Sequence, residues 1–362
     1  MDKRVDLPWP SWAAEAPPVW DSAADDVLVC VHVAQETHDV KTFTFAPLAP
    51  GVFRFFPGQF LTFTFNIGGD EISRCYTIAS PPTRPDRVSI TVKRVANGAV
   101  SNWLHETMEC GAQVRALGPF GDFTSFSSKT ERYLFISGGS GITPLMCMAR
   151  AYADLGLAAD IVFLHFARTP VDMIFRDELA TMARRSKAFR FLPVCESDAP
   201  FESWHGYRGR ISPEMLKCCA RDVMERAIYT CGPTGFMHSV REILSDLDFP
   251  LERYHEESFD FAVPAPVETT DTASLGGFRV TFARSNAALH CNGTQTVLEA
   301  AREAGLKLPA SCTRGLCGTC KSTLVSGRVD MTHAGGIRQR EIDRGQILIC
   351  CSRPLSDLVI DR

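Results

Sequence analysis

The chain has 362 residues, of which 45% are hydrophobic and 22% charged, a composition typical of two or three globular domains and unlike that of disordered or fibrous proteins. Its net charge of −4 does not favour nucleic-acid binding. The first 20 residues contain no apolar secretion signal, and no stretch is long and apolar enough for a membrane helix. We therefore expect a cytoplasmic protein that contacts neither membranes nor nucleic acid.

The first third of the chain is rich in short strand-like segments. Glycine, proline, asparagine and aspartate separate the apolar runs at 27–37, 40–47, 60–65 and 87–95, a pattern that predicts a small antiparallel barrel. Three short motifs follow one another there. They are Pro57-Gly-Gln-Phe60, Arg74-Cys-Tyr-Thr77 and Gly98-Ala-Val-Ser101, the last of which opens a short helix. Any one of them would be weak evidence of function.

From residue 131 the pattern changes to alternating strands and helices. A buried strand at 133–137 leads into the loop Gly138-Gly-Ser-Gly-Ile-Thr-Pro144 and an apolar helix at 145–155. A later strand ends in Cys231-Gly-Pro233. This order predicts a doubly wound α/β domain, which binds nucleotides at the carboxyl ends of its strands. The glycine loop lacks the G-x-G-x-x-G spacing, so on its own it is weak evidence.

Four of the 14 cysteines are organised differently from the rest. Cys312, Cys317 and Cys320 have C-x4-C-x2-C spacing, and Cys350 follows a strand-rich stretch. This is the plant-type ferredoxin spacing, in which four thiolates hold a [2Fe–2S] cluster. Structural zinc, the competing interpretation, usually shows two short paired spacings. The remaining choice at the fourth ligand is between two adjacent cysteines, and we take Cys350 as the ligand and Cys351 as a packing residue.

Taken together, these motifs resemble the flavin and NAD(P)H domains of the ferredoxin–NADP reductase superfamily. A strand at 278–282, a helix at 295–305 and the cluster loop also resemble the β-grasp ferredoxin fold. We accordingly expect a multidomain chain with an antiparallel β-barrel flavin domain, a doubly wound α/β nucleotide domain and a β-grasp [2Fe–2S] domain. The expected boundaries are an extension at 1–21, the barrel at 22–127, the NAD(P)H domain at 128–260, a linker at 261–275 and the ferredoxin domain at 276–362.

The resemblance implies a role for each motif of the barrel. Arg74 would neutralise a flavin phosphate, Tyr76 would pack on the isoalloxazine, and Thr77 would hydrogen-bond near the flavin N5. Backbone N–H groups at the start of the short helix would cap the pyrophosphate, because the helix dipole favours an anion there. The expected flavin-binding residues are Arg74, Cys75, Tyr76, Thr77, Lys93, Gly98, Ala99, Val100 and Ser101. A solvated charge at a strand edge is the alternative for Lys93 and its neighbour Arg94.

In the nucleotide domain, the resemblance implies that the glycine loop approaches the cofactor pyrophosphate and that the Cys-Gly-Pro loop lies beside the nicotinamide. Phe259 would cover the flavin face until the nicotinamide displaces it. The expected binding residues are Gly138, Gly139, Gly141, Thr143, Pro144, Cys231, Gly232, Pro233 and Phe259, with Thr77, Cys231 and Phe259 closest to the reaction. The alternatives are a structural cysteine at 231 and a packing role for Phe259.

The expected cofactors are FAD, a [2Fe–2S] cluster and NADH. FAD is favoured over FMN by the position of the 98–101 segment, and NADH is favoured over NADPH by family analogy. Arg168, Arg184 and Arg185 could reach a 2′-phosphate, although surface helix charges are the favoured interpretation. A nicotinamide gives two electrons, a flavin releases them singly, and the cluster carries one, so this order converts a hydride donor into a one-electron source.

The whole chain most resembles reductase components of Rieske oxygenases, in particular those of glycine betaine-type monooxygenases. We expect an NADH-dependent reductase, monomeric, that serves a Rieske-type terminal oxygenase acting on a quaternary ammonium compound. The alternatives are an NADH oxidoreductase for a hybrid-cluster protein and a redox sensor or scaffold without turnover. Residues 276–362 carry 12 Lys and Arg against 7 Asp and Glu, which indicates either a basic docking face or a small basic module whose charges are simply solvated.

Overall fold

The computed structural model describes residues 17–22, 24–128, 130–259, 277–306, 308, 310, 313–315, 317–334, 336–337 and 339–362. The linker predicted at 261–275 and most of the extension predicted at 1–21 lie outside this set. The described residues form two compact units, one within Met1–Leu61 and Tyr76–Asp260, the other within Thr62–Cys75 and Phe261–Arg362. None of the described helices has the length and apolar character needed to span a membrane.

Antiparallel strands make up the first part of unit one. Strand β1 pairs with both β2 and β6, and β2 pairs with β5. Side chains such as Phe43, Phe45 and Ile90 alternate into the interior, as expected for strands with one buried face. The elements are β1 (Val27–Thr37), β2 (Val40–Pro47), β5 (Val88–Lys93), α1 (Ala99–Thr107) and β6 (Gln113–Phe120).

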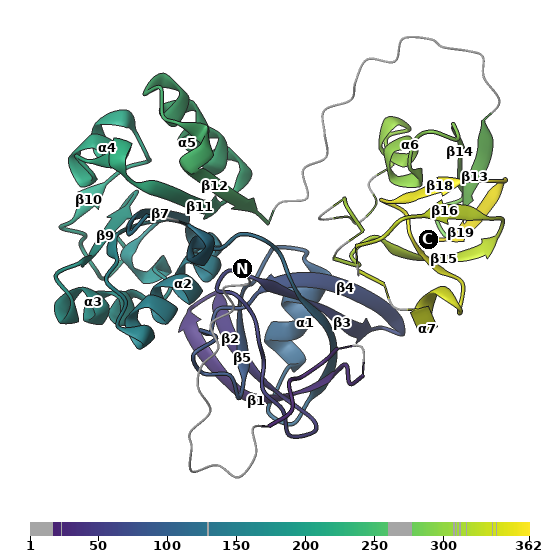
Figure 1. Ribbon diagram of the computed structural model, residues 1–362, viewed down its shortest axis with the longest axis horizontal. Helices are drawn as coiled ribbons and strands as arrows, with labels where there is room; N and C mark the ends of the chain where they lie inside the picture. Colours follow the sequence, from purple (N-terminus) through teal and green to yellow (C-terminus); the bar gives the residue numbers. More distant parts are fainter. Residues whose placement is uncertain are drawn as a thin grey trace. The chain divides into compact units, whose positions relative to one another are not determined.

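The second part of unit one is a parallel sheet of six strands in the order β10-β9-β8-β7-β11-β12 (Figure 1). Its strands are β7 (Arg132–Gly138), β8 (Asp160–Ala167), β9 (Phe189–Cys195), β10 (Tyr207–Arg208), β11 (Ala227–Gly232) and β12 (Tyr254–Ser258). Its helices are α2 (Ile142–Leu155), α3 (Arg176–Arg185), α4 (Pro213–Cys219) and α5 (Thr234–Asp246). The chain order reverses between β7 and β11, which is where such sheets bind nucleotides.

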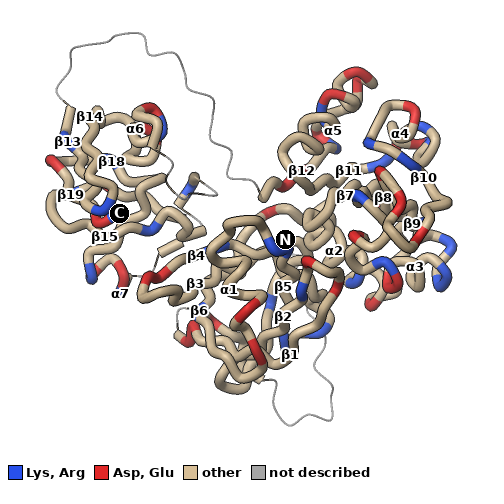
Figure 2. The backbone as a smooth tube through the Cα atoms, turned by 180° about the vertical axis from the view of Figure 1, so that it is seen from behind, with Lys and Arg blue, Asp and Glu red and all other residues tan. Residues whose placement is uncertain are grey.

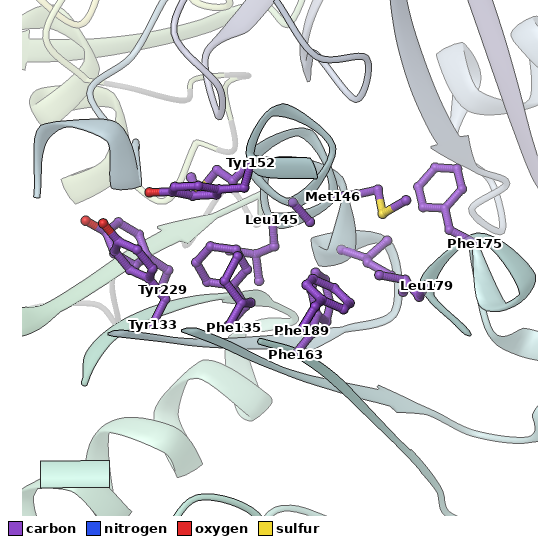
Figure 3. Packing of buried hydrophobic residues seen from close by; sticks show 14 of the residues in the cluster. Tyr133, Phe135, Leu145, Met146, Tyr152, Phe163, Phe175, Leu179, Phe189 and Tyr229 are labelled. Carbon is purple, nitrogen blue, oxygen red and sulfur yellow. The ribbon is translucent and has the colours of Figure 1, made fainter. Parts of the chain in front are cut away.

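Both faces of this sheet are buried, which explains its nearly continuous apolar strands. Odd-numbered residues such as Phe135, Phe163 and Tyr229 pack under α2 and α3, and Figure 3 shows these rings beneath Leu145 and Tyr152 of α2. The even-numbered residues pack against α4 and α5 on the opposite face. The two helical layers hold the carboxyl ends of β7 and β11 in fixed register.

Unit two contains a five-stranded sheet in the order β14-β13-β19-β15-β17 and a small two-stranded sheet, β16-β18. Helix α6 begins with a capping box, in which the Thr296 and Glu299 side chains each bond the other's backbone N–H. The elements are β13 (Phe278–Phe282), β14 (Ala287–Cys291), α6 (Val297–Glu303), β15 (Lys321–Ser326), β16 (Val329–Met331), α7 (Gln339–Ile342), β17 (Gln346–Leu348), β18 (Ser352–Pro354) and β19 (Leu358–Asp361). The strands β3 (Phe60–Ile67) and β4 (Asp70–Thr77) also lie largely in this unit.

Candidate flavin, nucleotide and cluster sites

Three of the four predicted cluster ligands converge in unit two. Cys317, Cys320 and Cys350 are all buried, and the thiols of Cys320 and Cys350 are hydrogen-bonding partners. The hydrogen bond from Cys320 lowers the pKa of Cys350, which favours the thiolate, the form in which cysteine binds a metal. Cys312 lies outside the described residues.

Glycines let the cluster loop approach its surroundings closely. Gly315 and Gly318 have φ of 69° and 70°, in the left-handed region. A Cβ at Gly315 would lie 2.7 Å from the Cys351 sulfur, and one at Gly318 would lie 2.7 Å from the Gly336 oxygen. Close-packed backbone around converging buried thiols suits a [2Fe–2S] cluster, whose sulfurs accept backbone N–H bonds.

Cys351 offers a matched control for its neighbour Cys350. Its thiol is only half-buried and donates to the Leu348 oxygen at 3.6 Å. We expect Cys350→Ser to lose most of its iron and the visible absorbance of the cluster, whereas Cys351→Ser keeps both. Iron and sulfide analysis of the purified variants checks this. Equal iron content in the two variants would show that Cys350 is not a ligand.

The strand that carries Arg74 and Cys75 contacts the cluster loop within unit two. Strand β3 contacts the same loop, because its Thr62 hydroxyl donates to the Cys317 carbonyl at 2.5 Å. The Cys75 sulfur lies 3.3 Å from the Thr319 hydroxyl oxygen, which is itself 3.3 Å from the Cys317 sulfur. Cys75, which the sequence assigned to the flavin, therefore has its closest described contacts in the cluster loop.

The Pro-Gly-Gln motif holds the end of the flavin-motif strand. The Gln59 carbonyl accepts from the Ile78 N–H at 2.9 Å, and its side-chain amide donates to the Gly121 carbonyl at 3.0 Å. A Cβ at Gly58 would overlap the Phe123 carbonyl, so only glycine fits there. These contacts fix the backbone directly after Thr77.

Gly98 and Ser101 form the expected helix start. Gly98 is the N-cap of α1, and the Ser101 hydroxyl accepts from the Val95 N–H at 3.1 Å and donates to the Gly98 carbonyl at 3.2 Å. The first N–H groups of a helix lack intrahelical acceptors, so this turn suits a phosphate. Lys93 lies 3.3 Å from the Asp39 carboxylate and forms an ion pair with it.

The two nucleotide loops meet at the carboxyl ends of neighbouring strands of the parallel sheet. Ser137, at the end of β7, lies in register with Cys231 on β11. A Cβ at Gly141 would overlap the Cys231 backbone, so the glycine is what allows the loops to touch. On the other side of β11, Ser258 of β12 pairs with Gly232, and Phe259 follows with 37% of its surface exposed.

Sequence reasoning missed Glu257. Its carboxylate accepts a hydrogen bond from the Thr77 hydroxyl at 3.5 Å, although the two residues are 180 positions apart. Burial raises the pKa of Glu257 to about 8, and the Thr77 bond opposes the shift. The sequence shows two adjacent glutamates and gives no sign of which one points inward. This carboxyl lies beside a predicted flavin contact and can hold a proton near neutral pH.

Glu257 makes stability depend on pH. Its pKa in the folded chain is above the usual 4.5, so between about 4.5 and 8 the folded state binds more protons than the unfolded state and stability falls as pH rises. We expect Glu257→Gln to remove this decline, which raises the melting temperature at pH 8 by a few degrees relative to wild type but not at pH 4.5. Melting curves of both proteins across this range check the difference. The exposed Glu252→Gln is the control, and parallel curves for wild type and Glu257→Gln would contradict the assignment.

Asp172 is a second residue that sequence reasoning missed. Arg168 follows directly after β8, and its guanidinium lies 3.3 Å from Asp172 and 3.9 Å from Asp39. Asp172 is itself fixed, because it accepts from the Thr169 N–H at 3.1 Å and from the Thr169 hydroxyl at 2.6 Å. An acidic residue in this region of a nucleotide-binding sheet suits a ribose 2′-hydroxyl, whereas an unopposed arginine suits a 2′-phosphate. The capping sequence Thr-x-x-Asp was the available signal.

Removing the Asp172 charge should relax the choice of coenzyme. We expect Asp172→Asn to raise kcat/KM for NADPH several-fold and to lower that for NADH, because Arg168 then has one opposing carboxylate fewer. Steady-state reduction of ferricyanide with each coenzyme measures the ratio. Asp177→Asn, on the exposed surface of α3, is the control. An unchanged NADPH/NADH ratio would exclude Asp172 from coenzyme selection.

The structure combines antiparallel strands and a helix start suited to a phosphate, a parallel sheet with two glycine loops, and a cysteine-lined loop. Together they define an oxidoreductase built from flavin, nucleotide and iron–sulfur modules. Three family models match in that order: the oxidoreductase FAD-binding domain at residues 28–125, the oxidoreductase NAD-binding domain at 135–242 and the 2Fe-2S iron-sulfur cluster binding domain at 280–355. The predicted fold class and the predicted cofactors FAD, NADH and [2Fe–2S] are thereby confirmed.

Several known proteins match nearly the whole chain. The glycine betaine monooxygenase reductase subunit of Pseudomonas aeruginosa is 41% identical over 346 residues, which cover 92% of this chain and 94% of the relative. The stachydrine N-demethylase reductase subunit of Rhizobium meliloti is 38% identical, with 94% and 97% covered. The solved structure of phthalate dioxygenase reductase, described as modular for electron transfer from pyridine nucleotides to [2Fe–2S], has a TM-score of 0.56 at 25% identity, with 93% and 97% covered. The chain belongs to this family of NAD(P)H-dependent flavin iron–sulfur reductases, the electron-transfer components of oxygenase systems.

Proposed function

We propose that this protein passes electrons from NADH through FAD and [2Fe–2S] to a Rieske-type terminal oxygenase that acts on a quaternary ammonium compound such as glycine betaine. The observation that carries the proposal is the identity of 41% and 38% to two reductase subunits whose names specify N-methylated substrates. The loops that meet at Gly141 and Cys231 and the converging thiols of the cluster loop support the electron path.

Most of the predicted binding residues have a role in this proposal. Arg74 and Tyr76 hold the flavin, the N–H groups at 98–101 bind its pyrophosphate, and Thr77 lies near the flavin N5. The glycine loop binds the nucleotide pyrophosphate, while Cys231 and Phe259 orient the nicotinamide. Bound flavin supplies the change from two-electron to one-electron chemistry. The domain boundaries stay as predicted from the sequence, and we propose that one chain acts as a monomer.

The substrate class is tested by coupling the reductase to purified oxygenases. We expect NADH-dependent formaldehyde release from glycine betaine in the presence of a glycine betaine oxygenase, and less or none with stachydrine and carnitine systems. Cys350→Ser should abolish the release. No turnover in any system, with ferricyanide reduction intact, would contradict an oxygenase partner of this class and favour a hybrid-cluster protein as the acceptor.

Exposed positive charge on unit two supports the proposal that the acceptor docks through an acidic surface. Arg314 lies in the cluster loop, and Arg340 and Arg344 lie at α7, all with exposed side chains. Figure 2 shows acidic residues interspersed at α7, and one of them, Glu341, is paired with Lys321 at 2.6 Å. This ion pair links α7 to Lys321, which directly follows Cys320.

Salt should therefore slow electron transfer to the oxygenase more than NADH oxidation by ferricyanide. Oppositely charged docking surfaces associate faster at low ionic strength, because exposed charges more than about 10 Å apart are screened at 0.1 M salt. Initial rates of both reactions from low to high ionic strength measure the difference. Equal responses would exclude docking by charge.

A further inference from the structure

Arg362 lies against the backbone that carries the cluster ligand Cys320. Its guanidinium donates to the Lys321 carbonyl, to the Ser322 hydroxyl at 3.0 Å and to the Thr319 carbonyl at 3.5 Å. The acceptors therefore lie on both sides of Cys320. A planar guanidinium can bond several acceptors at once, so this single side chain fastens the segment 319–322.

The partners of this guanidinium are uncharged. In the part of the chain that the structure describes, no carboxylate lies within ion-pair distance of Arg362. The neighbouring acids have other partners: Asp361 pairs with Arg284 at 2.9 Å, and Glu341 pairs with Lys321 at 2.6 Å. Among the described residues, no Asp or Glu side chain therefore forms an ion pair with Arg362.

The surroundings of Arg362 also strengthen the electrostatic effect of its positive charge. The side chain is partly buried, and burial lowers the pKa of Arg362. The nearby Cys320 sulfur opposes that shift, whereas the neighbouring cations Arg74 and Arg284 add to it. An arginine remains protonated in proteins. A permanent cation in a partly desolvated position acts on nearby charge more strongly than one in water, because the effective dielectric constant is lower.

We infer that Arg362 positions the segment around Cys320 and that its positive charge makes the [2Fe–2S] cluster easier to reduce. The inference rests on the proposed cluster site. Reduction adds one electron, supplied through the flavin, and hence one negative charge at the cluster. A nearby cation stabilises the reduced form more than the oxidised form and so raises the reduction potential.

The test is the midpoint potential of the cluster in the holoenzyme, measured by redox titration followed by electron paramagnetic resonance. Arg362→Gln, which removes the charge, should shift the potential to more negative values at unchanged iron content. Arg362→Lys, which keeps the charge but not the planar fork, should stay closer to wild type. The matched control is Arg353→Gln, because Arg353 is an exposed arginine of the same unit whose guanidinium bonds the Thr294 carbonyl, and this variant should leave the potential unchanged.

The inference is overturned if Arg362→Gln is fully loaded with iron and has the wild-type potential, or if Arg353→Gln shifts the potential as far. Should Arg362→Gln fail to hold iron, Arg362→Lys decides. A loaded lysine variant near the wild-type potential supports the role of the charge, and a loaded lysine variant with a clearly more negative potential contradicts it. A lysine variant with little iron supports the positioning role of the planar guanidinium. The oxygenase takes no part in this measurement, so a failure to support formaldehyde release would leave the result unaffected.

Discussion

Close contact between the backbones of Gly141 and Cys231 is the constraint on which the nucleotide site depends. No side chain fits at residue 141, because its Cβ would overlap the backbone of the neighbouring strand end. The parallel register of β7 and β11 brings the two loops to one edge, and the aromatic layer under α2 holds that register. The cluster loop has the same constraint. At Gly315 and Gly318 the backbone lies so close to its neighbours that a Cβ would not fit.

Buried ionisable groups differ in whether an opposite charge compensates them, and this difference distinguishes structural from functional positions. Arg226 is fully buried, but its guanidinium bonds the carboxylates of Asp160 and Asp222 at 2.7 and 2.8 Å, so its charge is compensated within the sheet. Within the described residues, Arg362 bonds uncharged groups, and the Glu257 carboxylate accepts from a hydroxyl. Uncompensated groups of this kind cost stability, and they lie beside the cluster loop and the flavin motif, where a displaced charge or proton can serve the reaction.

The sequence predicted what is encoded locally. Cysteine spacing, the two glycine loops and the order of the flavin motifs each lie within a few residues, and together they were sufficient for the fold class and the cofactors. Helix boundaries were close as well, since α6 spans Val297–Glu303 against a predicted helix at 295–305. Glu257 and Arg362 could not be predicted in the same way. The contact of Glu257 with Thr77 joins segments 180 residues apart, and that of Arg362 with Ser322 joins segments 40 apart.

The central claim is that electrons from NADH reach the cluster only through the flavin. Anaerobic addition of NADH to the holoenzyme, followed by electron paramagnetic resonance, tests it most directly. The account predicts the signal of a reduced [2Fe–2S] cluster in the holoenzyme, its absence after the flavin is removed, and its return when FAD is added back. A cluster signal of equal size and rate in the flavin-free protein, or none in the holoenzyme, would contradict the proposed electron path.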